Sequence, residues 1–177
     1  MTDGLDILAQ GIVTGNLALI QGLGLYAVTR YTKDTHTALR AGLNTFAGML
    51  VGATLLWLLG GYVPTSPAPQ VGFYLVIGLI SALSAPFLTR RNVLSEEYVV
   101  DSALIGMLLL LGRDGITGVV NVWVVAGAGL GYVLTLVVMA TLRQRLELSP
   151  VPKALKGTPI ILITAGLLAI ALLGFRF

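Results

Sequence analysis

Cysteine is absent from this sequence of 177 residues. Its absence excludes disulfide bonds, thiolate metal sites and cysteine nucleophiles. Charge is also scarce, because Asp, Glu, Lys and Arg make up only 11% of the chain, against about 25% in a typical soluble domain. Apolar residues reach 56%, and the surface of a water-soluble protein cannot be built from this composition. We therefore predict an all-α integral membrane protein.

The basic residues indicate topology rather than a nucleic-acid surface. The formal net charge is +3 and the isoelectric point is about 9.5, but Lys and Arg are spread over short loops. Asp3 and Asp6 precede the first apolar run, where a cleavable signal peptide carries a basic segment. We expect neither a signal peptide nor a nucleic-acid partner.

Six apolar segments follow one another, and about 20 residues suffice to cross a bilayer as a helix. We predict spans over residues 5–28, 38–59, 71–88, 99–112, 119–142 and 159–173. The connection 62–70 contains three prolines and no charge, which is typical of an extended surface linker. The fourth span has only 14 residues, which favours a half-helix or re-entrant segment. A turn is expected at 113–115.

The stretch 16–29 is apolar, yet it contains Asn16, Gln21, Gly22 and Gly24. Glycine lowers helix propensity, and amide side chains need partners in hydrocarbon. We predict that this helix is interrupted or closely packed at mid-membrane, in the functional region. Together with the short fourth span, the break predicts one domain over 1–177. Its halves, about 1–90 and 91–177, would form a 3+3 inverted repeat.

Lys and Arg are distributed unevenly between the two ends of the predicted spans. Loops after the first, third and fifth spans hold nine of the eleven basic residues, when Arg40 at the start of the second span is counted with the first loop. Basic loops favour the cytoplasm, so we predict a multi-pass protein of the inner (cytoplasmic) membrane with both termini outside. The opposite side carries Arg113 and Arg176.

Asp101 is the carboxylate that the sequence singles out. Inside a membrane such a group is costly and by default functional. Alternatively, the fourth span starts at the interface, where Asp101, Glu96 and Glu97 are solvated. Arg113 and Asp114 could likewise line an ion path or form an exposed turn.

Amide side chains form a second group of candidates. Their oxygens suit Na+-like hard cations, or they form hydrogen bonds between helices. The amides concerned are Asn16, Gln21, Asn44 and Asn121. The small residues Gly127, Gly129 and Gly131 predict a face on which helices approach closely.

Three segments carry a resemblance to a known family: TDGLDILAQGIVTGNLALIQGLGLYAVT (2–29), FYLVIGLISALSAPFLTRR (73–91) and ATLRQRLELSPVPKALKGTPIILITAGLLAIALLGF (140–175). They resemble the Rnf/Nqr membrane subunits, and the two terminal segments resemble the RnfA/NqrE branch. The resemblance implies a six-helix inverted repeat that pairs with a homologous subunit of inverted topology. It also implies other membrane redox subunits, in a complex that couples electron transfer to Na+ or H+ transport.

In that family, cysteines from helices one and four bind a shared [2Fe-2S] cluster. The family's GLC stretch matches Gly24-Leu25-Tyr26, and its NCAVLG stretch matches 101–106. Tyr26 and Ser102 therefore hold the ligand positions. Because such clusters are ordinarily held by thiolates, the resemblance implies a cysteine-free member without a cofactor.

Nothing in the chain resembles an active site for covalent chemistry, so we expect at most a non-catalytic subunit of an oxidoreductase complex, structural or ion-conducting. The alternatives are a self-standing small ion or solute transporter with the same fold, and an assembly scaffold. A neighbouring gene for a similar protein beside redox subunits would favour the first hypothesis.

Overall fold

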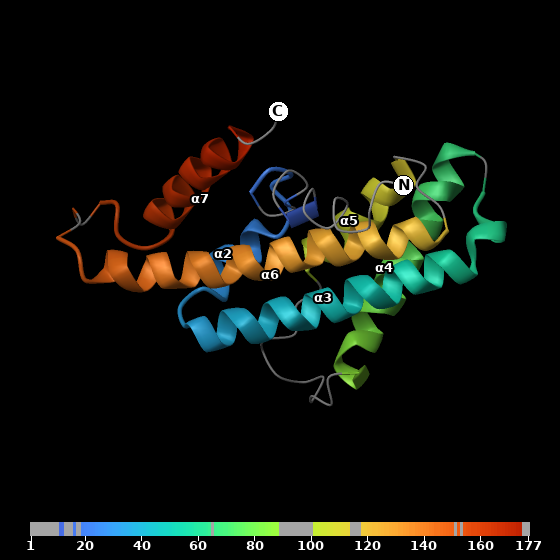
Figure 1. Cartoon of the computed structure of the whole chain (residues 1–177), viewed down its shortest axis with the longest axis horizontal. Coiled ribbons are helices and arrows are strands. Elements are labelled where there is room, and N and C mark those ends of the chain that lie inside the picture. The colour runs from blue at the N-terminus through green and yellow to red at the C-terminus, as the bar shows by residue number, and fades with distance from the viewer. Residues whose placement is uncertain are drawn as a thin grey trace.

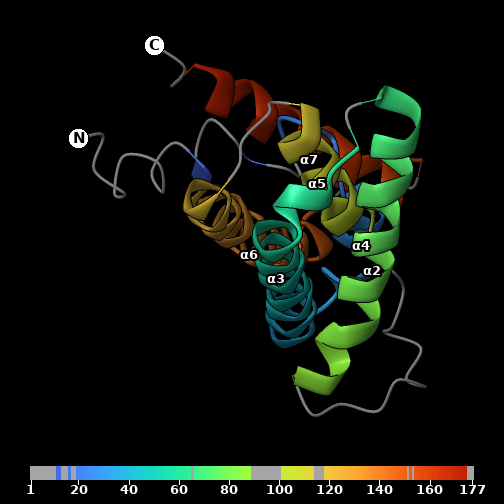
Figure 2. The same ribbon diagram turned by 90° about the vertical axis from the view of Figure 1, so that its right-hand side faces the viewer.

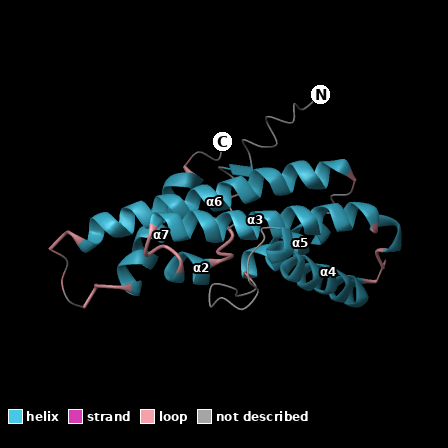
Figure 3. Ribbon diagram, turned by 90° about the horizontal axis from the view of Figure 1, so that it is seen from below, coloured by secondary structure: helices cyan, strands magenta, loops and turns pink. Residues whose placement is uncertain are grey.

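The computed structural model describes residues 11–12, 16, 19–64, 66–88, 101–113, 118–150, 152 and 154–174. Within these residues, helices and loops make up the whole structure (Figure 3). The elements are α2 (Leu25–Arg30), α3 (Thr35–Leu58), the short 3₁₀ helix η1 (Gly60–Tyr62), α4 (Pro67–Leu88), α5 (Ser102–Arg113), α6 (Val119–Glu147) and α7 (Thr158–Leu173).

Helix α3 lies at the centre of the bundle. It runs alongside α6, its most extensive neighbour, down the long axis of the molecule (Figure 1). Viewed from the end, α4 stands on the other side of α3 (Figure 2). Helix α5 packs against α4 and α3, while α7 contacts α2 and α6 near one end. Residues far apart in sequence therefore meet around the middle of α3 and α6.

Glycine permits the closest approach between α6 and the N-terminal part of the chain. A Cβ atom added at Gly131 would lie 2.9 Å from the Cα atom of Ile12, and one added at Gly11 would lie 2.8 Å from the backbone nitrogen of Ala128. Backbones in such contact have no room for side chains between them. The predicted small-residue face of α6 therefore contacts the backbone of residues 11–12.

Three described helices are long and apolar enough to cross a membrane: α3, α6 and the 67–84 part of α4. Helices α5 and α7 are apolar but shorter. Large apolar side chains such as Leu83 and Leu167 are exposed, as suits contact with lipid. The predicted all-α membrane class is confirmed. Six spans agree with this architecture, while the 3+3 inverted repeat stays a prediction.

Two predicted boundaries are wrong for identifiable reasons. Helix α4 begins at Pro67, inside the predicted linker 62–70, and η1 also enters that linker. Proline is tolerated in the first turn of a helix because the N–H group that it lacks has no partner there. Helix α6 continues to Glu147, beyond the predicted end at residue 142. Its extension is supported by an ion pair one turn apart, Arg143 Nε to Glu147 Oε1 at 3.4 Å.

The turn predicted at 113–115 is also wrong at its first residue. Arg113 is the last residue of α5, where a cation interacts favourably with the helix dipole. Asp114 and Gly115 lie outside the described residues.

One end of the bundle gathers basic residues from two loops. The Arg143 Nη1 atom donates to the Thr29 carbonyl at 3.0 Å, which joins the end of α6 to the end of α2. Lys33 follows in the connection to α3. Figure 1 shows the start of α3 and the end of α6 at this same end. The orientation of this end toward the cytoplasm stays a prediction.

Orientation can be tested on a chain that contributes no background thiols. A cysteine at position 33 (Lys33→Cys) should react with a membrane-impermeant maleimide only from the cytoplasmic side. Tyr62 lies beyond the other end of α3 and is 79% exposed, so Tyr62→Cys should react only from outside. The measurement is labelling of intact cells against inverted vesicles. The reverse pattern would overturn the predicted orientation.

Candidate functional site

The N-terminal segment turns sharply just before α2. Residues 19–24 are not helical, and α2 has only six residues. Gly22 has a φ angle of 68° and Gly24 one of 77°, a left-handed conformation that favours glycine. These two glycines are candidates that the sequence singled out, and they form the turn from which α2 starts.

Asn16 precedes this turn and connects it to α6 by hydrogen bonds. Its side chain is only 3% exposed, and Nδ2 donates to Thr135 Oγ1 at 2.7 Å and to the Gly131 carbonyl at 3.3 Å. Its Oδ1 atom accepts from the Leu19 N–H at 3.1 Å. These contacts are the interhelical hydrogen bonds that were one of the two alternatives for this residue. Gln21, by contrast, is exposed.

Asp101 immediately precedes α5 and binds three donors. Its Oδ1 atom accepts from the Ala103 N–H at 3.1 Å, the contact of a helix N-cap. Its Oδ2 atom accepts from Thr45 Oγ1 at 3.1 Å and from the Tyr132 hydroxyl. The carboxylate thus joins α5 to α3 and α6.

The depth of this carboxylate follows from its partners. Thr45 is the eleventh of the 24 residues of α3, and Tyr132 is the fourteenth of the 29 residues of α6. Tyr132 is fully buried. Asp101 therefore lies midway along two helices that are able to cross a membrane, and protein hydroxyls bind it. Asp101 itself is half-buried, and its position inside the membrane stays a prediction. Glu96 and Glu97 lie outside the described residues.

The turn before α2 and the start of α5 touch each other. The Gly24 N–H donates to Ser102 Oγ at 3.1 Å. A Cβ atom at Gly24 would lie 2.8 Å from Tyr132 Cε2 and 3.1 Å from Ala103 Cβ. A glycine is therefore required where the turn passes between the Tyr132 ring and α5. We call the contact of Gly24, Asp101, Ser102 and Tyr132 the seam.

Sequence reasoning missed Thr45, Tyr132 and Thr135, the residues that bind Asp101 and Asn16. Each lies in the middle of a long apolar helix. A polar side chain at that depth needs a partner, so the sequence indicates that these residues form hydrogen bonds. It does not indicate with which residues, because Thr45 and Tyr132 lie 56 and 31 residues from Asp101.

The remaining candidates are not brought to the seam. Arg113 is exposed at the far end of α5. Asn121 is buried near the start of α6, and its Oδ1 atom has no hydrogen-bond partner among the described residues. Asn44 is half-buried on α3 and makes an interaction of its own.

Comparison with known proteins decides the family. The model of the family "Rnf-Nqr subunit, membrane protein" matches residues 98–177. The chain is 33% identical to a subunit of the ion-translocating oxidoreductase complex of Syntrophotalea carbinolica, over 99% of this chain and 97% of the relative. The chain belongs to the Rnf/Nqr membrane-subunit family. The resemblance in its terminal segments is thereby confirmed.

Two further Rnf/Nqr relatives cover nearly the whole chain. The corresponding subunit of the ion-translocating oxidoreductase complex of Azotobacter vinelandii is 30% identical over 99% of this chain and 97% of its own length. The corresponding subunit of the Na(+)-translocating ferredoxin:NAD(+) oxidoreductase complex of Acetobacterium woodii is 30% identical over 96% of this chain and 94% of its own length. Because the coverage is nearly complete, the α2 turn and the start of α5 both lie within the shared region.

Tyr26 and Ser102, which the resemblance assigns to the cluster positions of the Rnf/Nqr family, do not fit an iron–sulfur cluster. Tyr26 and Ser102 offer hydroxyl oxygens, whereas these clusters take thiolates and sometimes imidazoles. Ser102 Oγ already accepts the Gly24 N–H, and Tyr26 is 52% exposed. Among the described residues, no three His, Asp or Glu side chains gather where they could hold a metal ion. The polar groups of the seam are thus hydroxyl oxygens, carboxylate oxygens and backbone N–H groups.

The seam reaches the surface of the chain. Gly22, Tyr26 and Ser102 are exposed, whereas Gly24 and Tyr132 are buried. The seam therefore has a buried side that holds the carboxylate and an exposed side that another molecule can contact.

The close packing of the seam predicts a difference between two neighbouring glycines. Gly24→Ala and Gly22→Ala both place a side chain at positive φ, which costs about 1–2 kcal/mol. Only Gly24→Ala also forces a methyl group against Tyr132, since a Cβ atom at Gly22 meets nothing within 4 Å. We expect about 1–3 kcal/mol of additional destabilisation for Gly24→Ala. Thermal unfolding in detergent measures this, and equal shifts in both variants would contradict the seam.

Proposed function

We propose that this protein is a membrane subunit of an Rnf/Nqr-type redox-coupled complex that translocates Na+ or H+. In this complex it has a structural or ion-conducting role and binds no iron–sulfur cluster. The names of the relatives support the proposal, since the Syntrophotalea and Acetobacterium proteins are both named as subunits of an ion- or Na+-translocating oxidoreductase complex. The absence of a cluster is supported by Tyr26 and Ser102, which offer hydroxyl oxygens instead of thiolates.

The observation that carries an ion-conducting role is the Asp101 carboxylate at mid-span. A charged group at the centre of a membrane helix costs about 2.5–3.5 kcal/mol on insertion scales. A functional role is therefore the best explanation for a carboxylate at this position. Carboxylate and hydroxyl oxygens are the ligands of hard cations, and Thr45 and Tyr132 provide two hydroxyls on one carboxylate oxygen. An ion or proton bound here would change the contacts that join α5 to α3 and α6.

We further propose that the chain is one domain with the 3+3 inverted repeat, halves 1–90 and 91–177. The two irregular segments that would begin the halves meet at the Gly24–Ser102 hydrogen bond. Broken helices that meet at mid-membrane are typical of inverted repeats. The chain would lie in the inner (cytoplasmic) membrane with both termini outside.

The proposed partner is a homologous six-helix subunit of inverted topology, together with other membrane redox subunits. The surface at and beside the seam supports this, because Ser102 and the nearby Tyr26 are exposed in the single chain. Polar groups at that depth need protein partners where water is absent.

Gentle purification from native membranes, followed by mass spectrometry, tests the complex. We expect recovery with a second six-span homologue and with flavin or iron–sulfur subunits. A tagged membrane protein of another family, purified in parallel, controls for general co-purification. Recovery alone or as a homo-oligomer would refute the complex and favour the self-standing transporter.

Asp101→Asn tests the ion-conducting role. Asparagine keeps the shape and an oxygen for the α5 cap but removes the charge, so we expect ion transport by vesicles containing the complex to fall about tenfold or more. Asp34→Asn is the matched control, since Asp34 is exposed in the loop before α3 and its side chain makes no capping hydrogen bond. Subunit content is measured alongside transport. Unchanged transport in an intact complex would leave Asp101 only its structural role.

A further inference from the structure

A polar cavity of about 490 Å³ opens at the basic end of the bundle, and Tyr26, two residues after Gly24 of the seam, also lines it. Its volume lies in the range of about 300–1,000 Å³ typical of small-molecule sites. Arg30, Lys33 and Arg143 line it, together with the hydroxyl groups of Thr37 and Thr158, and no acidic residue is among the described residues of its lining. Elements α2, α3, α6 and α7 all contribute to it, so its shape depends on the fold.

The three cations have different roles. Arg143 is held in place: its side chain is 14% exposed, Nη1 donates to the Thr29 carbonyl, and Nε pairs with Glu147. Arg30 and Lys33 are exposed, and no ion pair is found for either within the described part of the chain. The cavity therefore carries uncompensated positive charge beside one fixed guanidinium group.

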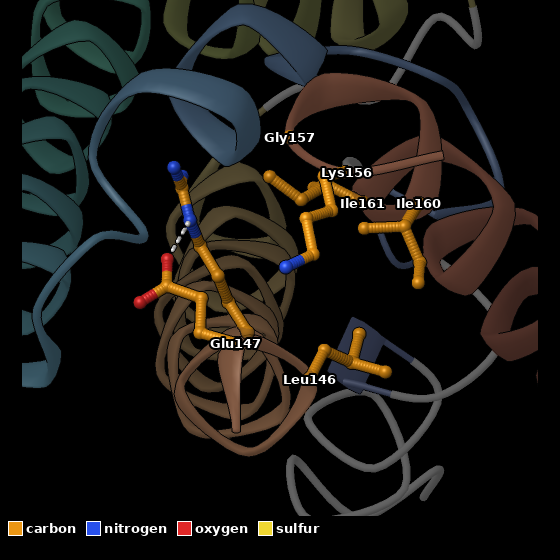
Figure 4. A pocket seen from close by; sticks show the side chains of 7 residues that line it. Leu146, Glu147, Lys156, Gly157, Ile160 and Ile161 are labelled. Carbon is orange, nitrogen blue, oxygen red and sulfur yellow. Dashed lines mark hydrogen bonds and ion pairs between the residues drawn. The ribbon is translucent and has the colours of Figure 1, made fainter. Parts of the chain in front are cut away.

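A second cavity, of about 190 Å³, meets the first at Arg143. Leu146, Ile160 and Ile161 line one part of it, and the charged side chains of Arg143, Glu147 and Lys156 line the rest. In Figure 4, Glu147 on α6 and Lys156 before α7 extend from opposite sides of it. Exposed apolar side chains continue along α7, among them Ile163 and Leu167. A basic pocket thus leads into an apolar surface.

We infer that these cavities bind an anionic phospholipid, with its phosphodiester headgroup at Arg30, Lys33 and Arg143. Juxtamembrane basic residues attract anionic headgroups, and basic pockets between helices bind them. A lipid fits better than free phosphate for two reasons. The pocket lies at the ends of apolar helices, where headgroups lie, and the apolar side chains of the adjoining cavity, with the exposed apolar side chains of α7, suit an acyl chain.

Titration of the purified full chain with phosphatidylglycerol, in a zwitterionic detergent, tests the site. Native mass spectrometry counts bound lipid. Removing two cations at about 1 kcal/mol each should weaken binding by about tenfold or more in the Arg30→Gln/Lys33→Gln variant. Arg40→Gln/Arg145→Gln is the matched control: both residues are exposed and neither lines the two cavities. This control should bind nearly as the original chain does.

Each other outcome counts against the lipid site. Equal loss in both double variants would mean general charge attraction, and retained binding in the pocket variant would place the lipid elsewhere. Equal binding of phosphatidylcholine would refute headgroup selection. Displacement of the lipid by millimolar inorganic phosphate would assign the pocket to free phosphate. Displacement by an acidic peptide alone would assign it to a protein partner.

Discussion

Hydrogen bonds across the seam are the constraint on which this structure depends. An interrupted helix leaves polar backbone groups without their usual partners, and in a membrane the protein must supply new ones. Here the start of α5 supplies one such partner to the turn before α2, since Ser102 Oγ accepts the Gly24 N–H. Asn16 and Asp101 then bind hydroxyl groups on α3 and α6. The N-terminal segment is therefore anchored to α6, and the start of α5 is anchored to both α3 and α6.

Hydrogen bonds of about 3 Å demand that backbones approach closely, and glycine makes the approach possible. Gly24 passes against the Tyr132 ring, and Gly131 faces the backbone of Ile12. Lipid gives helices little hydrophobic reason to associate, so tight packing and polar contacts hold them together. The small residues of α6 and the polar contacts of the seam thus act together to hold the helices in close contact.

Much of the helical framework could be predicted from long apolar runs, as in α3, α6 and α7. The start of α4 could not be predicted in this way. Pro67 and Pro69 favour a linker, but the first turn of a helix also tolerates proline. The end of α6 was missed because Arg143 and Glu147 are polar but pair one turn apart. Glycines and amides indicated where the N-terminal segment turns. The partners of Asp101 depend on how helices pack over long sequence separations, which no local pattern encodes.

Helix α2 has a consequence that follows from its length alone. Its six residues amount to about 9 Å of rigid rod, with Gly24 at one end and Arg30 at the other. The helix therefore starts from the seam at Gly24 and contributes Tyr26, Thr29 and Arg30 to the lining of the basic cavity. About one and a half turns of helix are thus shared between the carboxylate site and the cationic surface.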